Sequence, residues 1–157
     1  MKVTLILVGK TNDDYLKIGI QKYIDRLKFY CQFSIVEIPE LKVSNKLSTD
    51  EIKKKEGELI RAKIPQNCTV FLLDENGKEY SSRQFSQLIQ KSMNDSAKEL
   101  CFVIGGAYGF SPEIYALAPA KISFSKMTFS HQMIRLFLVE QMYRGFAIIN
   151  NLPYHHD

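Results

Sequence analysis

The 157-residue sequence lacks an apolar run long enough to cross a membrane. No stretch approaches the roughly 18 uncharged apolar residues that span a bilayer. The first ten residues, MKVTLILVGK, hold a short apolar run without a small-residue cleavage site, so they do not resemble a secretion signal. We therefore expect a cytoplasmic protein with no membrane partner.

Cysteine is also sparse, with three residues that are far apart in the chain. Cys31, Cys68 and Cys101 lie at or near the edges of strand-like runs, without a CxxC pair and without a histidine at metal-ligand spacing. Because an unpaired cysteine commonly packs as a small hydrophobic residue, we predict buried or half-buried free thiols. The pattern predicts no metal site.

The charge balance is only mildly basic, with a formal net charge of +4. Such a charge permits an anionic partner such as nucleic acid without requiring one. The length and a hydrophobic content of 45% fit one domain with a sizeable core, and we predict a single domain over residues 1–157.

Five strand-like runs alternate with segments of helical periodicity. We predict strands at residues 3–9, 33–38, 68–74, 100–106 and 121–125, a turn at 75–78, and helices at 13–29, 48–64, 81–93, from 111 and from 130. Ser48 and Ser81 open two of these helices with capping boxes, and Ser111 before Pro112 opens a third. The alternation predicts an α/β fold, a mostly parallel sheet with helices on both faces, and the apolar run at 3–9 predicts a central strand.

Three loops follow the third, fourth and fifth predicted strands. They are residues 73–75, 105–109 and 125–129. Because open parallel sheets bind ligands beyond the carboxyl ends of their strands, we expect the three loops to converge on one site.

The second of these loops, in the stretch CFVIGGAYGFSPE, is rich in glycine but matches neither common phosphate-binding pattern. A Walker A loop would need Lys and Ser or Thr after its last glycine, where Phe110 and Ser111 stand. A dinucleotide fingerprint would need a different glycine spacing in the first βα turn. The glycines suit either a flat, mostly uncharged ligand held by backbone groups or simply a sharp strand-to-helix turn.

The last predicted helix has polar residues on two sides and an apolar centre. Leu136 to Val139 cannot all face one sheet, so the helix needs cover on two sides, from its own domain or from a second copy. We favour a symmetric homodimer because so small a domain has few other elements for that cover. Glu140 and Arg144, at i and i+4, are predicted to pair.

The segments FVIGGAYG, ISFSKMTFSHQMIRLFLVEQMYRGFAI and PYHH together resemble the SPOUT-class methyltransferases, in particular the ribosomal RNA large subunit methyltransferase H family. The resemblance extends over nearly the whole chain, including VGK and EGELI. It implies a SPOUT-type fold whose C-terminal third is threaded into a trefoil knot, and a homodimer that binds S-adenosyl-L-methionine in the knot. It also implies methylation of N3 of a pseudouridine in large-subunit ribosomal RNA, on the assembled ribosome.

The resemblance also implies site residues. Carried over by position, the cofactor-binding residues would be Leu73, Gly105, Phe124, Ser125, Lys126, Met127, Thr128 and Phe129, with Gly106 and Gly109 shaping the same loop. His131, Tyr154, His155 and His156 are candidate catalytic residues: a histidine could accept the N3 proton, and Tyr154 could stack on the target base. Arg135 and Lys10 are candidate substrate-binding residues, and Lys53, Lys54 and Lys55 are either a solvated face or a second RNA contact.

The tail departs from the pattern of the family. Family tails commonly end Tyr-His-Arg or Tyr-His-Lys, whereas this chain ends Tyr154-His155-His156-Asp157, so a titratable residue replaces an obligate cation. Two other functions therefore stay open: a SPOUT enzyme with a different RNA target, and a dimeric binding module that has lost catalysis.

Overall fold

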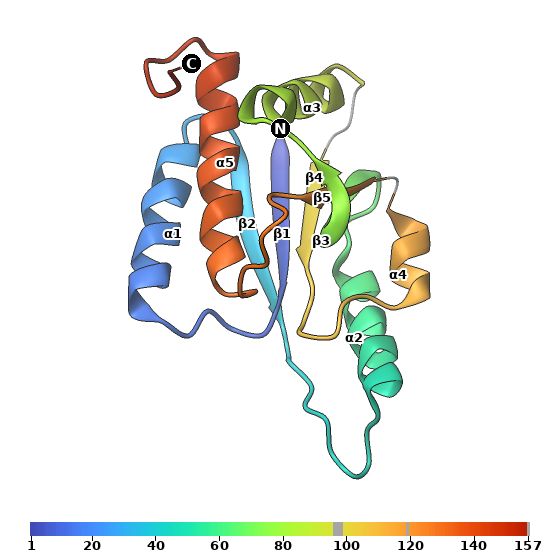
Figure 1. The fold of residues 1–157 in the computed structure, drawn as a ribbon. Helices are drawn as coiled ribbons and strands as arrows, with labels where there is room; N and C mark the ends of the chain where they lie inside the picture. Colours follow the sequence, from blue (N-terminus) through green and yellow to red (C-terminus); the bar gives the residue numbers. More distant parts are fainter. Residues whose placement is uncertain (96–98, 119, 157) are drawn as a thin grey trace.

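The computed structural model describes residues 1–95, 99–118 and 120–156, and its strands and helices alternate along these residues (Figure 1). The strands are β1 (Lys2–Val8), β2 (Gln32–Ile38), β3 (Cys68–Glu79), β4 (Glu99–Ile104) and β5 (Ala120–Ser123). The helices are α1 (Asp14–Leu27), α2 (Thr49–Lys63), α3 (Ser82–Asn94), α4 (Pro112–Leu117) and α5 (Met133–Ile149). None of the helices in the described ranges has the length and apolar character needed to cross a membrane.

The strands form one sheet in the order β2-β1-β4-β3-β5, and every pairing is parallel. This confirms the predicted parallel α/β architecture. The central strand, however, is β4, and β1 lies between β2 and β4. The prediction of a central first strand was wrong because β1 and β4 are both apolar on two faces, so their sequences do not distinguish the two interior positions.

Helices cover both faces of the sheet. Helices α1, α3 and α5 pack together on one face, and α2 and α4 lie on the other (Figure 1). Along β1, Leu5 and Leu7 join the core beneath the first group, whereas Ile6 and Val8 join the core beneath the second. Because successive strand residues point to opposite faces, a continuous apolar strand such as β1 needs helices on both sides.

Side-chain caps define the helix starts as the sequence predicts. Ser48 and Ser81 each accept a hydrogen bond from the backbone N–H three residues on, and the side chains of Glu51 and Gln84 accept the backbone N–H of Ser48 and Ser81 in return, which completes both capping boxes. The Ser111 hydroxyl caps α4, with Pro112 in the first turn. These caps satisfy backbone donors that no helical carbonyl can reach.

Strand β3 is longer than the sequence indicates. It continues through the predicted turn at residues 75–78 and pairs with β5 on both sides of an irregularity between Leu73 and Lys78. Within this bulge the N–H of Asn76 donates to Oδ1 of Asp74 at 2.8 Å. The polar residues predicted as a turn do interrupt the regular pairing of β3. Pairing with β5 nevertheless keeps the residues on either side of them in the sheet.

Helix α5 begins at Met133, three residues after the predicted start at Ser130. The Ser130 hydroxyl accepts the N–H of Met133 at 3.1 Å, so residues 130–132 form a turn before the helix. From there α5 runs from the edge where the strands end to the opposite edge, where the C-terminal tail lies (Figure 1).

The cysteines pack as predicted. Cys31 and Cys101 are buried, Cys68 is half-buried, and all three are free thiols. Burial raises the pKa of the Cys31 thiol to about 11, so that this group stays protonated at neutral pH.

Candidate active site

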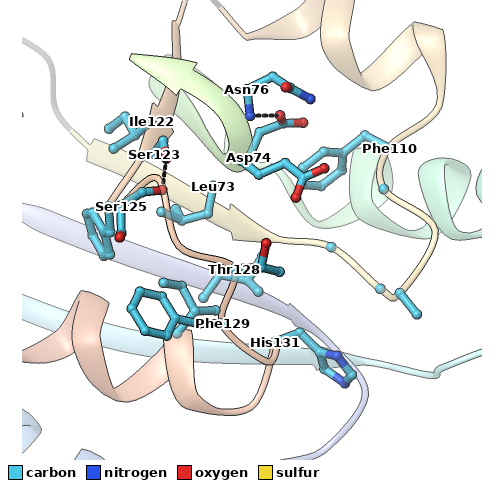
Figure 2. Close-up of a pocket in the computed structure, with 18 of the residues that line it drawn as sticks. Leu73, Asp74, Asn76, Phe110, Ile122, Ser123, Ser125, Thr128, Phe129 and His131 are labelled. Atoms are coloured by element: carbon cyan, nitrogen blue, oxygen red, sulfur yellow. Dashed lines mark hydrogen bonds between the residues drawn. The ribbon is translucent and has the colours of Figure 1, made fainter. Parts of the chain in front are cut away.

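A cavity of about 460 Å³ lies beyond the carboxyl ends of β3, β4 and β5 (Figure 2). All three predicted loops line it. The residues with predicted cofactor roles that line the cavity are Leu73, Gly105, Gly106, Gly109, Phe124, Ser125, Met127, Thr128 and Phe129. Lys126 has an exposed side chain and is not among the lining residues, although its neighbours on both sides are.

Serine side chains shape the loop between β5 and α5. The Ser123 hydroxyl donates to the carbonyl oxygen of Ser125 at 2.9 Å (Figure 2). The Ser125 hydroxyl accepts the N–H of Met127 at 2.9 Å. Phe129 then packs edge-on against Phe137 of α5, with ring centroids 5.0 Å apart. These hydrogen bonds within the loop and its contact with α5 hold the loop in place. This wall of the cavity is therefore formed in the absence of a ligand.

The glycine loop forms the opposite wall and has little room for side chains. A Cβ on Gly105 would lie 2.9 Å from the Phe110 ring, and a Cβ on Gly106 would lie 2.9 Å from a carboxylate oxygen of the buried Glu56. Gly109 has a φ of +79°, which side-chain-bearing residues rarely adopt. The tight packing and the φ of Gly109 confirm the explanation by a sharp turn, and the glycines also line the cavity, while a ligand held by their backbone groups stays a prediction.

The charged residues of the cavity wall are acidic. Asp74 and Glu75 line the cavity, and the described lining residues include no Lys or Arg. The Tyr115 hydroxyl donates to Oδ2 of Asp74 at 2.6 Å. Burial, together with this bond, raises the pKa of Tyr115 to about 12, so the phenol remains a donor at neutral pH. Tyr115 lies on α4 and was not among the predicted site residues, since helical spacing does not show which strand end a side chain reaches.

His131 lies at the edge of the same cavity, where the loop enters α5. Its side chain is half-buried, which leaves it open to a ligand. Of the four candidate catalytic residues, this is the one that the fold brings to the cavity of its own chain.

Arg135 is buried with 0% of its surface exposed, although it was predicted to bind substrate. Its guanidinium donates to the carbonyl oxygens of Val8 and His131 at 2.8 and 3.1 Å and to Oγ1 of Thr11 at 3.0 Å. Burial lowers the pKa of Arg135. In this fold the residue does not reach an RNA surface; it ties the end of β1 to the start of α5, beside His131.

Gln132 makes a second tie between the same two segments. Its side-chain amide donates to the carbonyl oxygen of Lys10 and accepts the N–H of Asn12, both at 2.9 Å. The side chain of Lys10 is itself exposed. The loop that carries this candidate substrate-binding residue is therefore fixed against the helix that borders the cavity.

The tail residues form a separate polar cluster against the middle and second half of α5. The predicted pair is confirmed: Arg144 donates to Oε1 of Glu140 at 2.6 Å. The same oxygen accepts the Tyr154 hydroxyl at 3.0 Å, and the Arg144 guanidinium lies 4.7 Å from the centre of the Tyr154 ring. Arg144 Nη1 is also 3.3 Å from Nδ1 of His155. Burial, with bonds to Tyr23 and Glu140, raises the pKa of Tyr154.

Within one chain, this tail cluster lies further along α5 than the cavity. Ile134 in the first turn of α5 lines the cavity, and Glu140, which holds the tail, is six residues on, or about 9 Å along the helix. Tyr154 and His155 are held by these contacts, His156 is exposed, and none of the three lines the cavity of its own chain.

Comparisons with known proteins agree along the whole chain. Residues 1–155 match the model of a family described as "Predicted SPOUT methyltransferase". The chain is 53% identical over 156 residues to the ribosomal RNA large subunit methyltransferase H of Christiangramia forsetii, with 99% of both chains covered. It is 52% identical over 157 residues to the protein of the same name in Flavobacterium johnsoniae, with 100% of both covered.

A solved structure shares the fold. The chain superimposes with a TM-score of 0.55 and 12% identity on a probable methylase family protein from Haemophilus influenzae Rd KW20. The superposition covers 95% of this chain and 66% of that one, so this chain spans just under two thirds of the other protein's length.

The cavity fits S-adenosylmethionine, the cofactor that the sequence resemblance implies. Its volume of about 460 Å³ lies within the roughly 300–1,000 Å³ of small-molecule sites. Phe110 and Phe129 offer aromatic surface to a flat base, and the glycines offer backbone groups. Asp74 and Glu75 suit the two positive charges of this ligand, its sulfonium and its ammonium.

Proposed function

The chain belongs to the SPOUT methyltransferases and, within them, to the ribosomal RNA large subunit methyltransferase H family, and on this premise we propose that it methylates large-subunit ribosomal RNA with S-adenosylmethionine. One observation carries the proposal. Seven of the eight positions that match the cofactor residues of the family, together with Gly106 and Gly109, line a single cavity at the carboxyl ends of the strands. An α/β fold alone would not indicate a methyltransferase, because this fold serves many functions.

The proposed substrate atom is N3 of a pseudouridine, within the assembled ribosome in the cytoplasm. Its support is the sequence resemblance together with the small basic surface of the chain. Lys10 and Lys126 are exposed near the cavity, but a net charge of +4 offers few phosphate contacts. Recognition would then depend on the shape of the ribosome rather than on a short RNA sequence.

The chemistry asks the chain mainly to position the two reactants. When bound, S-adenosylmethionine supplies a methyl group on a positively charged sulfur, which is already a strong donor. The cavity wall would hold the cofactor, and polar side chains near the rim would align the base and accept its N3 proton. His131 is the candidate base from the same chain, and His155 and His156 are the candidates from a tail.

We infer that the enzyme is a homodimer in which each tail serves the cavity of the other copy. The support is geometric: the tail residues contact α5 from Glu140 onward, and none of them lines the cavity of its own chain. A twofold interface that packs α5 antiparallel to its counterpart would bring each tail to the partner's cavity. Leu136 and Phe137 are half-buried on α5 and leave apolar surface for such an interface.

The proposed trefoil knot rests on the resemblance. Consistent with it, two of the three segments that line the cavity, 104–110 and 122–134, belong to the last third of the chain. Knots are rare among protein folds, and periodicity in a sequence does not predict them.

Methylation of purified ribosomes tests the proposed function. We expect the protein to transfer label from methyl-labelled S-adenosylmethionine to large-subunit RNA in ribosomes from a strain that lacks the protein, and not to ribosomes already modified. Label on a different RNA would instead support a SPOUT enzyme with another target. Cofactor binding without label on any RNA would support a binding module. Sedimentation at micromolar concentration tests the dimer.

A further inference from the structure

The charged residues that line the cavity are acidic, and methyl transfer would change the charge of the ligand that they face. Its charged lining residues in the described part of the chain are Asp74 and Glu75, and His131 is the remaining titratable nitrogen base. Lys121, whose ammonium lies 5.3 Å from the centre of the Tyr115 ring, and Lys126 are nearby cations that do not line the cavity. The wall therefore presents net negative charge to a ligand.

Asp74 is the better placed of the two carboxylates. Its side chain is half-buried, and one of its oxygens accepts the N–H of Asn76 at 2.8 Å (Figure 2). The other oxygen accepts the hydroxyl of Tyr115 at 2.6 Å. A carboxylate has about four acceptor positions, so two remain for a ligand. A fixed, half-buried charge is screened less by water and salt than an exposed one such as Glu75.

Methyl transfer changes the charge of the ligand in this cavity by one. The carbon–sulfur bond breaks with its electron pair going to sulfur, the methyl carbon bonds to N3, and the N3 proton leaves to a base. The sulfonium thereby becomes the neutral thioether of S-adenosylhomocysteine. The two ligands otherwise have the same adenosine and amino-acid groups.

We propose that Asp74 makes the cavity prefer the cationic cofactor over its neutral product, so that transfer itself weakens binding and favours product release. This inference rests on the proposed function. Tyr115 and Asn76 are positioning residues in it, because they hold the carboxylate without being required to touch the ligand. The glycine loop is compatible with a mostly uncharged ligand, and Asp74 adds the charge preference that the loop lacks.

Calorimetry with three ligands tests the inference on the full-length protein. S-adenosylmethionine and sinefungin both have a positive charge at the reacting position, and S-adenosylhomocysteine does not. For Asp74→Asn we expect affinity for the two cationic ligands to fall about threefold to tenfold more than affinity for the thioether, as expected for charges several ångströms apart in a partly solvated site. Asp74→Glu should keep most of the preference, because it keeps the charge.

Glu79→Gln is the matched control, since it removes the same charge from an exposed side chain of the same strand outside the cavity. It should leave the ratio of affinities within about twofold of the wild-type ratio. An equal loss of affinity for all three ligands in Asp74→Asn would overturn the inference while leaving the proposed function intact. Failure of the wild-type protein to bind any of the three would overturn both.

Discussion

Arg135 donates through Nη2 to the carbonyl oxygen of Val8 at 2.8 Å, and this bond joins residues that are 127 positions apart in the sequence. It connects the first strand to the helix that borders the cavity. Both groups are buried, so neither can exchange this partner for water. The relationship gives Arg135 a positioning role at the site, where the sequence alone indicated a contact with RNA.

We predict that Arg135→Met lowers the free energy of unfolding by about 2–4 kcal/mol, because it leaves the carbonyl oxygens of Val8 and His131 without their charged donor. Arg135→Lys should cost less, since an ammonium can keep some of these bonds. Urea unfolding of the purified variants measures both. Arg61→Met on the exposed face of α2 is the control and should change stability by less than about 0.5 kcal/mol. Equal losses of stability in Arg135→Met and Arg61→Met would contradict the role of buried Arg135 in joining β1 to α5.

Gly77 gives a second test, on the bulge that positions Asp74. A Cβ at this residue would lie 2.6 Å from the backbone carbon of Ile122. We expect Gly77→Ala to cost at least about 2 kcal/mol, because β3 and β5 would have to separate. Gly109→Ala is the comparison: it has an unfavourable φ of +79°, but its Cβ would make only an ordinary contact, 3.8 Å from the Tyr115 hydroxyl, and it should cost about 1 kcal/mol. A smaller loss at Gly77 than at Gly109 in thermal or urea unfolding would show that this region is not packed as described.

Glu56 predicts a pH dependence of stability. Burial raises the pKa of this carboxyl group, and the nearby Glu40 adds to the rise. The folded protein therefore holds the proton more tightly than the unfolded chain, so this group's contribution to stability falls as pH rises from about 4.3 through the folded pKa. Glu56→Gln removes that loss and keeps an acceptor for the N–H of Leu41.

The measurement is the free energy of urea unfolding at pH 4 and pH 7. The stability of Glu56→Gln relative to wild type should be higher at pH 7 than at pH 4. Glu58→Gln, two residues on and exposed, should show no such difference. A relative stability of Glu56→Gln that is independent of pH, or that falls with pH, would refute the assignment.

Because the tail cluster lies outside the cavity, we predict that a substitution in it lowers methyl transfer without lowering the affinity for the cofactor. Tyr154→Phe removes the hydroxyl that donates to Glu140, and neither residue lines the cavity of the same chain. We expect methylation of ribosomes to fall by about tenfold, the effect of one lost hydrogen bond, while affinity for S-adenosylmethionine stays within about twofold. Tyr80→Phe, outside both the cluster and the cavity, serves as the control and should leave both quantities unchanged. Parallel losses of binding and transfer in Tyr154→Phe would argue that the tail supports folding rather than the reaction.

The sequence predicted the cavity better than it predicted the individual contacts. Leu73, Gly105 and Thr128 could be placed together because parallel strands end at one edge of a sheet, whatever the details of packing. The pair formed by Asp74 and Tyr115 could not, since it depends on how α4 is rotated over β3 and not on any spacing within either segment.

The contacts of Arg135 and of the tail could not be predicted from the sequence either, and they join residues that are further apart in the chain. Helical spacing places Arg135 on one side of α5 but does not reveal that the β1–α1 loop covers that side. Tyr154 and His155 resemble the tail of the family, yet their distance from the cavity emerges only once α5 is seen to cross the sheet from edge to edge (Figure 1). Residues that contact their own chain and residues that contact a second copy follow the same periodic patterns in a sequence. Periodicity therefore does not show which of the two kinds of contact a residue makes.

The most direct test of the account is mass mapping of large-subunit ribosomal RNA from a strain without this protein. The account predicts that one N3-methylated pseudouridine becomes an unmethylated pseudouridine, and that the wild-type protein restores the methyl group while the Tyr154→Phe protein restores it poorly. A map that is unchanged in the absence of the protein would contradict the proposed function.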